Sequence, residues 1–225
     1  MTAEVKRLIQ IGADVNYRDR RRGREGWTPL IAAASGGNAK TVAALLDAGA
    51  NPELSDAEGW RPIHFAVGYP LGAIEKRTDV LRVLIDAGAD LNSVTAKGPP
   101  GINGTAGCDT ALFIAALFGR PDSVRLLLGA GADVSLRKFA GISPAYAAAA
   151  TARGADVLAI FVKAGVDLSE DMEIAKRKNQ TEIYERLVAA WDRGSTKRRT
   201  SITTLFTILA LVLRELGPLR RRLRA

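Results

Sequence analysis

The stretch Gly26–Glu53, GWTPLIAAASGGNAKTVAALLDAGANPE, predicts a helix, a tight turn, a second helix and an extended exit. Thr28 can cap the first helix, because its hydroxyl accepts a hydrogen bond from a free backbone N–H of the first turn, and Pro29 suits the next position. Apolar residues recur at helical spacing in residues 42–46. Gly49 should end the second helix, since glycine adopts the left-handed conformation of a helix terminus at little cost.

Two markers of this unit recur along the chain. The start of the first helix recurs at Thr28, Arg61, Thr110 and Ser143, with spacings of 33, 49 and 33 residues. The turn after the second helix recurs at Gly12, Gly49, Gly88, Gly131 and Gly165. The 16 extra residues of the long interval divide into 6 between the two helices of that unit and 10 in the loop that follows. Surface loops accept such additions, because closure entropy grows only logarithmically with loop length.

The motif Thr28-Pro29-Leu30 and its counterpart Arg61-Pro62-Ile63-His64-Phe65-Ala66 resemble the ankyrin repeat, which has the motif T-P-L-H-x-A and a period of about 33 residues. The resemblance covers about 190 of the 225 residues. It implies an all-α fold, an ankyrin-repeat solenoid of stacked helix-turn-helix units with β-hairpin loops, plus a separate C-terminal helix. We expect the repeat helices near residues 3–10, 29–35, 39–48, 62–68, 79–87, 111–118, 121–129, 144–152, 155–164, 172–178 and 181–191.

The charge distribution divides the chain into a repeat domain, 1–194, and a tail, 195–225. The net charge is +8, but the tail has eight basic residues and one acidic residue, so the repeat domain carries only +1. A basic fold that binds nucleic acid is therefore not expected.

The tail contains an apolar run, residues 201–213, between basic clusters. As a helix it would reach roughly 20 Å, which is too short for the 30 Å hydrocarbon core of a bilayer. Three alternatives stay open. The helix folds back on the last repeat, or it lies on an anionic membrane surface through residues 197–224, or it docks a partner or is non-native sequence.

The chain lacks the residues for most site chemistry. Cys108 is the only cysteine and His64 the only histidine, which excludes an internal disulfide and a zinc site. The resemblance implies a structural, hydrogen-bonding role for His64 and places Cys108 on an exposed hairpin. We therefore expect no catalytic residues, no metal, no cofactor and no small-molecule substrate.

The resemblance implies that a protein partner binds the hairpin tips and the concave side of the first helices. At the corresponding positions we predict the partner-binding residues Trp27, Trp60, Tyr69, Asp109, Leu117, Phe118 and Ile142. The alternative is that each tryptophan covers its own hairpin. The loop arginines form either a site for an anionic partner or a solvated loop: Arg20, Arg21, Arg22 and Arg24.

These observations predict a non-catalytic scaffold or adaptor for protein–protein interaction. The alternative is a membrane-surface adaptor that is tethered by its C-terminal helix. The N-terminus shows no secretory signal, so we expect a cytoplasmic location, with peripheral membrane association as the alternative. Residues 3–10 lack a covering first helix, which indicates either a degenerate cap or a fragment.

Overall fold

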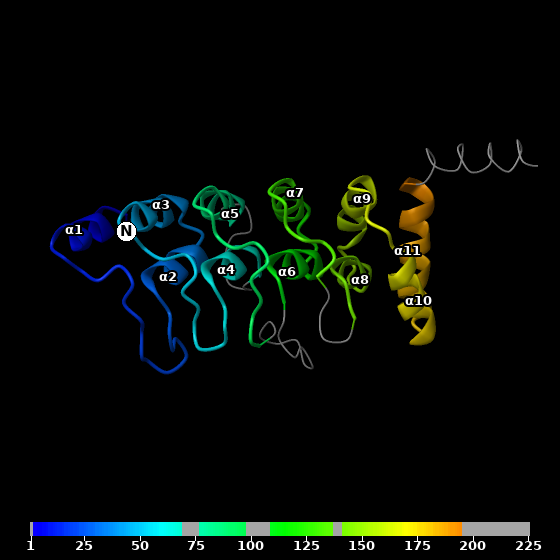
Figure 1. The fold of residues 1–225 in the computed structure, drawn as a ribbon, viewed down its shortest axis with the longest axis horizontal. Coiled ribbons are helices and arrows are strands. Elements are labelled where there is room, and N and C mark those ends of the chain that lie inside the picture. Colours follow the sequence, from blue (N-terminus) through cyan, green and yellow to red (C-terminus); the bar gives the residue numbers. More distant parts are fainter. Residues whose placement is uncertain (1, 69–76, 98–108, 137–140, 195–225) are drawn as a thin grey trace, which may run out of the picture.

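In a computed structural model, which describes residues 2–68, 77–97, 109–136 and 141–194, stacked pairs of helices follow one another in a row (Figure 1). No strand occurs within these ranges. The helices are α1 (Thr2–Gln10), α2 (Pro29–Ser35), α3 (Ala39–Asp47), α4 (Pro62–Gly68), α5 (Arg77–Asp86), α6 (Ala111–Leu117), α7 (Pro121–Gly129), α8 (Pro144–Ala149), α9 (Ala155–Lys163), α10 (Ser169–Arg177) and α11 (Thr181–Gly194).

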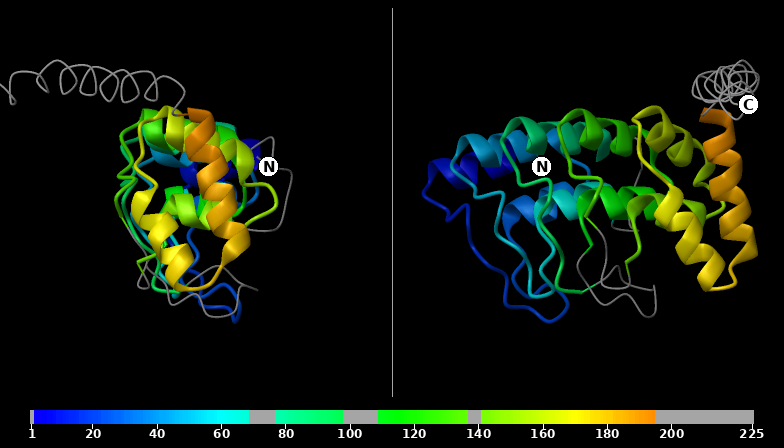
Figure 2. Two further views of the ribbon diagram at one scale, coloured as in Figure 1. Left: turned by 90° about the vertical axis from the view of Figure 1, so that its right-hand side faces the viewer. Right: turned by 45° about the vertical axis from the view of Figure 1, so that its right-hand side comes forward.

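The pairs form two layers of helices. The short helices α2, α4, α6 and α8 contact one another in sequence, and α1, α3, α5, α7 and α9 form the second layer (Figure 1). The described parts of the loops that join one pair to the next project from the same side of the stack (Figure 2). Each unit therefore packs on its neighbours, which confirms the predicted all-α solenoid.

The helices begin and end where the sequence predicts, within a few residues. The hydroxyls of Thr28, Thr110 and Ser143 each accept a hydrogen bond from the backbone N–H three residues later, at 3.1, 3.1 and 3.0 Å. Gly49 has φ +86°, the left-handed conformation that lets glycine end α3. The largest deviations are three residues each: α8 ends earlier than predicted, α10 begins earlier, and α11 ends later.

The core lies between the two layers and is built mainly from alanine, leucine, valine and isoleucine. Small residues let the first helices approach closely. At Gly68 of α4, a Cβ atom would lie only 2.1 Å from the Ile114 Cγ2 atom of α6. Ankyrin-like stacking of thin units thus depends on residues without bulky side chains at these contacts.

Helices α10 and α11 close one end of the row. They pack on each other, and α11 also contacts α8 and α9 (Figure 2). The Arg186 guanidinium of α11 donates hydrogen bonds to the backbone carbonyls of Ala149 and Thr151, at 3.0 and 2.9 Å. It thereby satisfies carbonyl groups that the end of α8 leaves without helical partners. The predicted C-terminal helix, 201–213, lies outside the described residues.

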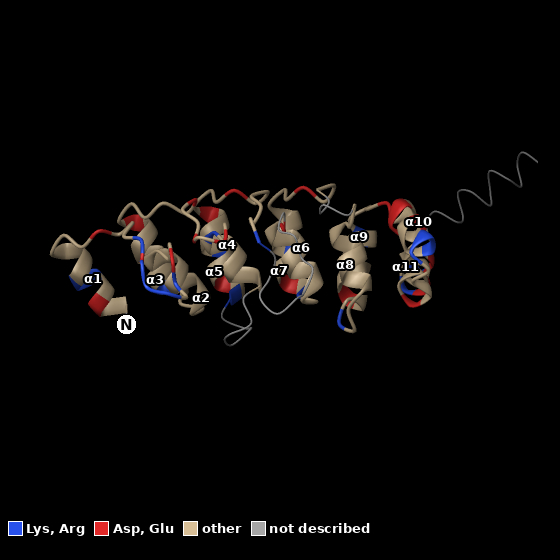
Figure 3. Ribbon diagram, turned by 90° about the horizontal axis from the view of Figure 1, so that it is seen from below, with Lys and Arg blue, Asp and Glu red and all other residues tan. Residues whose placement is uncertain are grey.

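The turns after the second helices share one acidic device. Asp14, Asp90, Asp133 and Asp167 each accept a hydrogen bond at Oδ1 from the backbone N–H two residues later, at 2.8 to 3.0 Å. Acidic segments recur along one long edge of the stack (Figure 3). These carboxylates are turn-formers, as predicted, and they do not converge on a common point.

Candidate functional site

The projecting loops of neighbouring units are joined by their backbones. Within a loop, the Asp19 N–H donates to the Trp27 carbonyl at 2.8 Å, and the Asp56 N–H donates to the Trp60 carbonyl at 2.9 Å. Between loops, the Ala57 N–H donates to the Glu25 carbonyl at 2.9 Å. These loops take the place of the expected β-hairpins, but isolated backbone pairs hold them and no strand is formed in their described residues.

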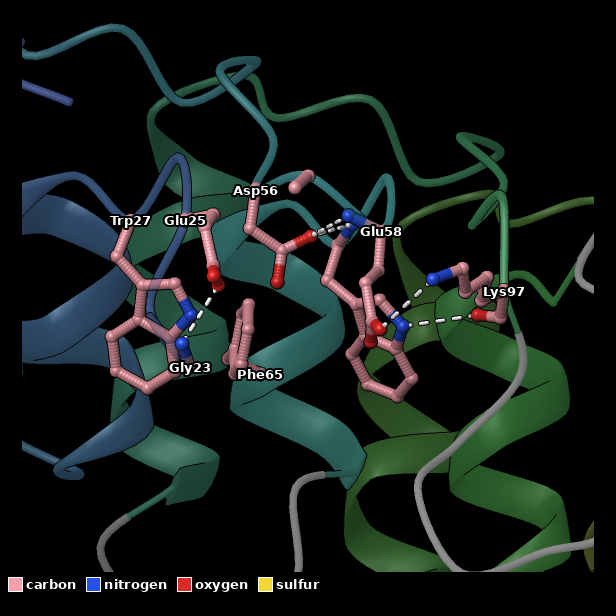
Figure 4. A pocket seen from close by; sticks show the side chains of 9 residues that line it. Gly23, Glu25, Trp27, Asp56, Glu58, Phe65 and Lys97 are labelled. Carbon is pink, nitrogen blue, oxygen red and sulfur yellow. Dashed lines mark hydrogen bonds and ion pairs between the residues drawn. The ribbon is translucent and has the colours of Figure 1, made fainter. Parts of the chain in front are cut away.

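A pocket of about 510 Å³ opens where the first two loops meet the start of α4 (Figure 4). It combines aromatic rings with three carboxylates and one ammonium group. Its lining residues are Gly23, Glu25, Trp27, Asp56, Ala57, Glu58, Trp60, Phe65 and Lys97. We call these nine residues the hairpin pocket.

Three aromatic rings form the inner wall of the hairpin pocket. The ring of Phe65 lies between the two tryptophans, with its centroid 5.1 Å from Trp27 and 5.5 Å from Trp60. Trp27 meets Phe65 edge-on and stays half-buried. Edge-to-face packing of this kind holds the Trp27 ring in place while part of it remains open to a partner.

The carboxylates of the hairpin pocket are held by hydrogen bonds. The Asp56 Oδ1 atom accepts from the backbone N–H groups of Glu58 and Trp60, at 2.9 and 2.8 Å. Burial raises the pKa of the Asp56 carboxyl above its ordinary value, although these two bonds act against the shift. Glu25 accepts from the Gly23 N–H at 2.8 Å, and Glu58 pairs with the Lys97 ammonium at 3.3 Å.

Comparison with known proteins identifies the family to which this architecture belongs. Models of ankyrin repeats match residues 2–95 and 72–128. The chain belongs to the ankyrin repeat family. Ankyrin repeats generally mediate protein–protein interactions and are typically non-catalytic.

The chain resembles parts of much longer proteins. It is 43% identical to Rabankyrin-5 of Homo sapiens over 75 residues, which are 30% of this chain and 6% of that protein. It is 30% identical to SH3 and multiple ankyrin repeat domains protein 2 of Homo sapiens over 141 residues, 62% of this chain and 6% of that protein. The mitochondrial disaggregase of Bos taurus is 36% identical over 144 residues, 63% of this chain and 18% of that protein.

The burial of Trp60 contradicts the sequence-based prediction of an exposed pair of tryptophans. Its side chain is 1% exposed, and its indole Nε1–H donates to the Lys97 carbonyl at 3.0 Å. The loop of the following ankyrin repeat therefore covers Trp60, whereas Trp27 stays half-buried. Trp60 therefore lies in the core, so the prediction that both tryptophans are exposed is wrong. A role of Trp60 in partner binding stays a prediction.

The other predicted partner-binding residues differ in accessibility. Asp109 is 0% exposed, which contradicts its prediction as a surface contact. Its backbone carbonyl accepts from the Thr95 N–H at 3.2 Å, so it belongs to the base of its hairpin. Leu117, Phe118 and Ile142 are half-buried and stay predictions. Tyr69 lies outside the described residues.

The arginine-rich loop precedes Trp27 in the ankyrin stack. Arg20, Arg21, Arg22 and Arg24 are all exposed. Arg21 binds the Asp19 carboxylate, with Nη2 to Oδ2 at 2.6 Å, and this hydrogen bonding lowers the pKa of Asp19 to about 2. The Arg24 guanidinium lies over the Trp27 ring, 5.3 Å from its centroid. Two of the four predicted arginines thus contact their own loop, and binding of an anionic partner here stays a prediction.

His64 has the structural role that the ankyrin motif implies. It is 0% exposed, and its Nδ1 atom accepts from the Arg61 N–H at 3.0 Å. Its Nε2 atom lies 3.0 Å from the Ser93 carbonyl, which requires a hydrogen on Nε2. The neutral ring therefore ties α4 to the loop after α5. Burial lowers the pKa of His64 to about 4.

The part of the chain that the structure describes offers neither a metal site nor a membrane span. There, no three His, Cys, Asp or Glu side chains lie close enough together to hold a metal ion. No helix of these ranges is long and apolar enough to cross a bilayer. Cys108 and the tail, including residues 197–224, lie outside the described residues.

The carboxylates of the hairpin pocket were missed by the sequence reasoning. The signal was present, because Glu25-Gly26-Trp27 recurs 33 residues later as Glu58-Gly59-Trp60. Equal positions in adjacent repeats lie side by side, so the repeated Glu-Gly-Trp places two carboxylates beside two indoles.

Proposed function

We propose that the chain is a non-catalytic adaptor that holds a protein partner against the loops and first helices of its ankyrin stack. The hairpin pocket carries this proposal, because it is a concave site with an aromatic wall and polar groups in fixed positions. The half-open ring of Trp27 offers the type of aromatic surface that is enriched at interface anchors.

The charge of the hairpin pocket favours a basic side chain from the partner. Glu25, Asp56 and Glu58 supply three carboxylates against the single ammonium group of Lys97. The face of Trp27 already holds the guanidinium of Arg24 at 5.3 Å, a cation–π arrangement. A lysine or arginine from the partner would meet the same ring and the Asp56 carboxylate.

Selection from a random peptide library on the full chain would test this proposal. We expect the selected peptides to share a basic residue, and their affinity to fall about tenfold for Asp56→Asn, the loss expected for a charge-assisted hydrogen bond. The asparagine can keep the two backbone hydrogen bonds that Asp56 accepts. Asp122→Asn, an exposed change on α7, is the matched control. Peptides without a basic residue, or equal losses in both variants, would contradict the proposal.

A second candidate function rests on the composition of residues 195–225, which carry +7 around an apolar run. We propose that this tail brings the adaptor to an anionic membrane surface. Flotation with vesicles of phosphatidylcholine and phosphatidylserine would compare the full chain with residues 1–194. Only the full chain should float, and equal flotation of both would remove the tail from consideration.

A further inference from the structure

A second, smaller pocket lies among the turns that join the two helices of adjacent units. It encloses about 170 Å³ and shares no residue with the hairpin pocket. Its lining residues are Thr78, Phe118, Gly119, Arg120, Pro121, Asp122, Ser123 and Arg153. We call these eight residues the turn pocket.

Two arginines line the turn pocket. Arg120 and Arg153 are 33 residues apart, so they hold equal positions in adjacent repeats. Neither makes an ion pair with a residue that the structure describes. Arg120 is half-buried and lies over the Phe118 ring, 5.7 Å from its centroid. The ring therefore helps to hold this guanidinium in place.

The arginines lie close enough to repel each other. Burial lowers the pKa of Arg120, and the charges of Arg153 and Arg77, a side chain only 2% exposed, lower it further. The one carboxylate in the lining, Asp122, is paired with Arg125 at 2.7 Å. Like charges that are brought together cost free energy, and functional sites are where such arrangements cluster.

The start of α7 adds neutral hydrogen-bond donors to the turn pocket. Ser123 is only 5% exposed, and its hydroxyl makes no hydrogen bond to another described residue. The backbone N–H groups of Asp122 and Ser123, in the first turn of this nine-residue helix, likewise have no acceptor among the described residues. Asp122, Ser123 and both arginines line the same small volume.

We propose that the turn pocket binds a phosphoryl group, which a phosphorylated side chain of a partner protein presents. A tetrahedral dianion can accept from two guanidinium groups, a hydroxyl and backbone N–H groups at once. The volume admits one such group, and its charge removes the repulsion between Arg120 and Arg153. The proposal is independent of the hairpin pocket and of the basic side chain proposed there.

NMR titration of the full chain would test the site with two probes, N-acetyl-phosphoserine amide and inorganic phosphate. We expect shifts confined to the amides of Gly119, Asp122 and Ser123. A lower Kd for the phosphoserine probe supports presentation by a protein side chain. A lower Kd for inorganic phosphate would overturn that source and leave a site for the free anion.

Matched variants decide whether these residues form the site. Arg120→Gln and Arg153→Gln should each raise the Kd of the phosphoserine probe at least tenfold, whereas Arg82→Gln, an exposed change on α5 that removes the same charge, should leave it unchanged. Ser123→Ala should raise the Kd severalfold at constant net charge, so it serves if an arginine variant fails to fold. Equal Kd values in the wild type, Arg153→Gln and Ser123→Ala, or an equal loss with Arg82→Gln, would overturn the proposal.

Discussion

Acid should destabilise the stack through His64, and the effect falls in a pH range where no other side chain type of this chain ordinarily titrates. The chain has one histidine, and histidine is the side chain whose ordinary pKa lies between pH 5 and 8. In the folded protein both ring nitrogens of His64 are engaged, one as an acceptor from Arg61 and one at the Ser93 carbonyl. A second ring proton would have to displace the Arg61 N–H.

The sign and size of the change in stability follow from the pKa values of His64 in the folded and the unfolded chain. The folded pKa is about 4, against 6.5 for an unperturbed histidine. Between these values the unfolded chain binds a proton that the folded chain does not, so the free energy of unfolding falls as the pH falls. The loss is about 2 kcal/mol between pH 7.5 and pH 5 and about 3 kcal/mol by pH 4, from 1.36 kcal/mol for each pKa unit.

Urea unfolding at pH 7.5, 6.5, 5.5 and 5.0, followed by circular dichroism, would measure this dependence. His64→Gln is the control, because its amide keeps hydrogen-bonding capacity but does not titrate. We expect the variant to be less stable than the wild type at pH 7.5 and to show a nearly flat profile down to pH 5. The two curves should therefore converge as the pH falls.

A wild-type profile that stays flat from pH 7.5 to pH 5 would refute the reasoning. So would the same slope in His64→Gln, because the proton would then bind elsewhere. An NMR titration of the His64 ring gives a direct check that does not depend on the variant. Its ring shifts should not reach a midpoint above pH 5 in the folded protein.

Three further predictions concern packing, capping and the domain boundary. Gly68→Ala should destabilise the stack by about 1–3 kcal/mol in urea unfolding, because its Cβ would collide with Ile114, whereas Gly129→Ala, with nothing within 4 Å, should be neutral or stabilising. Thr110→Ala should cost about 1 kcal/mol by the same assay, and Thr110→Ser much less, because serine can still accept from the Phe113 N–H. Residues 1–194 alone should keep the thermal midpoint of the full chain, and a drop of many degrees would contradict the predicted domain boundary.

The repeat fold could be predicted because its signals are local and recur. Thr28 caps α2 through an N–H three residues away, and Gly49 ends α3 through its own backbone conformation. Such features need no knowledge of distant residues. A fixed interval between them then implies stacking, since each thin unit must bury its apolar side against a neighbour.

The accessibility of the site could not be predicted in the same way. Trp27 and Trp60 hold the same motif position, yet Trp60 is buried because its indole reaches the carbonyl of Lys97, 37 residues later. Asp109 is buried at the base of its own hairpin. The exposure of these positions depends on where a neighbouring loop lies. That loop belongs to the repeat that departs from the 33-residue interval.

The proximity of Arg120 to Arg153 could have been predicted from the sequence, but the charge around them could not. Their 33-residue separation equals one repeat, which places equal positions beside each other. The sequence alone does not show that the one carboxylate in the lining beside them, Asp122, is already paired with another side chain. That conclusion needs the ion pair between Asp122 and Arg125.

The hydrogen bonds between neighbouring loops join main-chain atoms. The carbonyls of Glu25 and Glu58 accept from Ala57 and Ala96, and a carbonyl group is the same whichever residue carries it. Substitution of Glu25 or Glu58 therefore keeps the hydrogen bonds between the loops and changes only the side chains that the loops expose. The side chains of this surface can therefore be diversified, by evolution or by design, while the backbone of the loops stays the same.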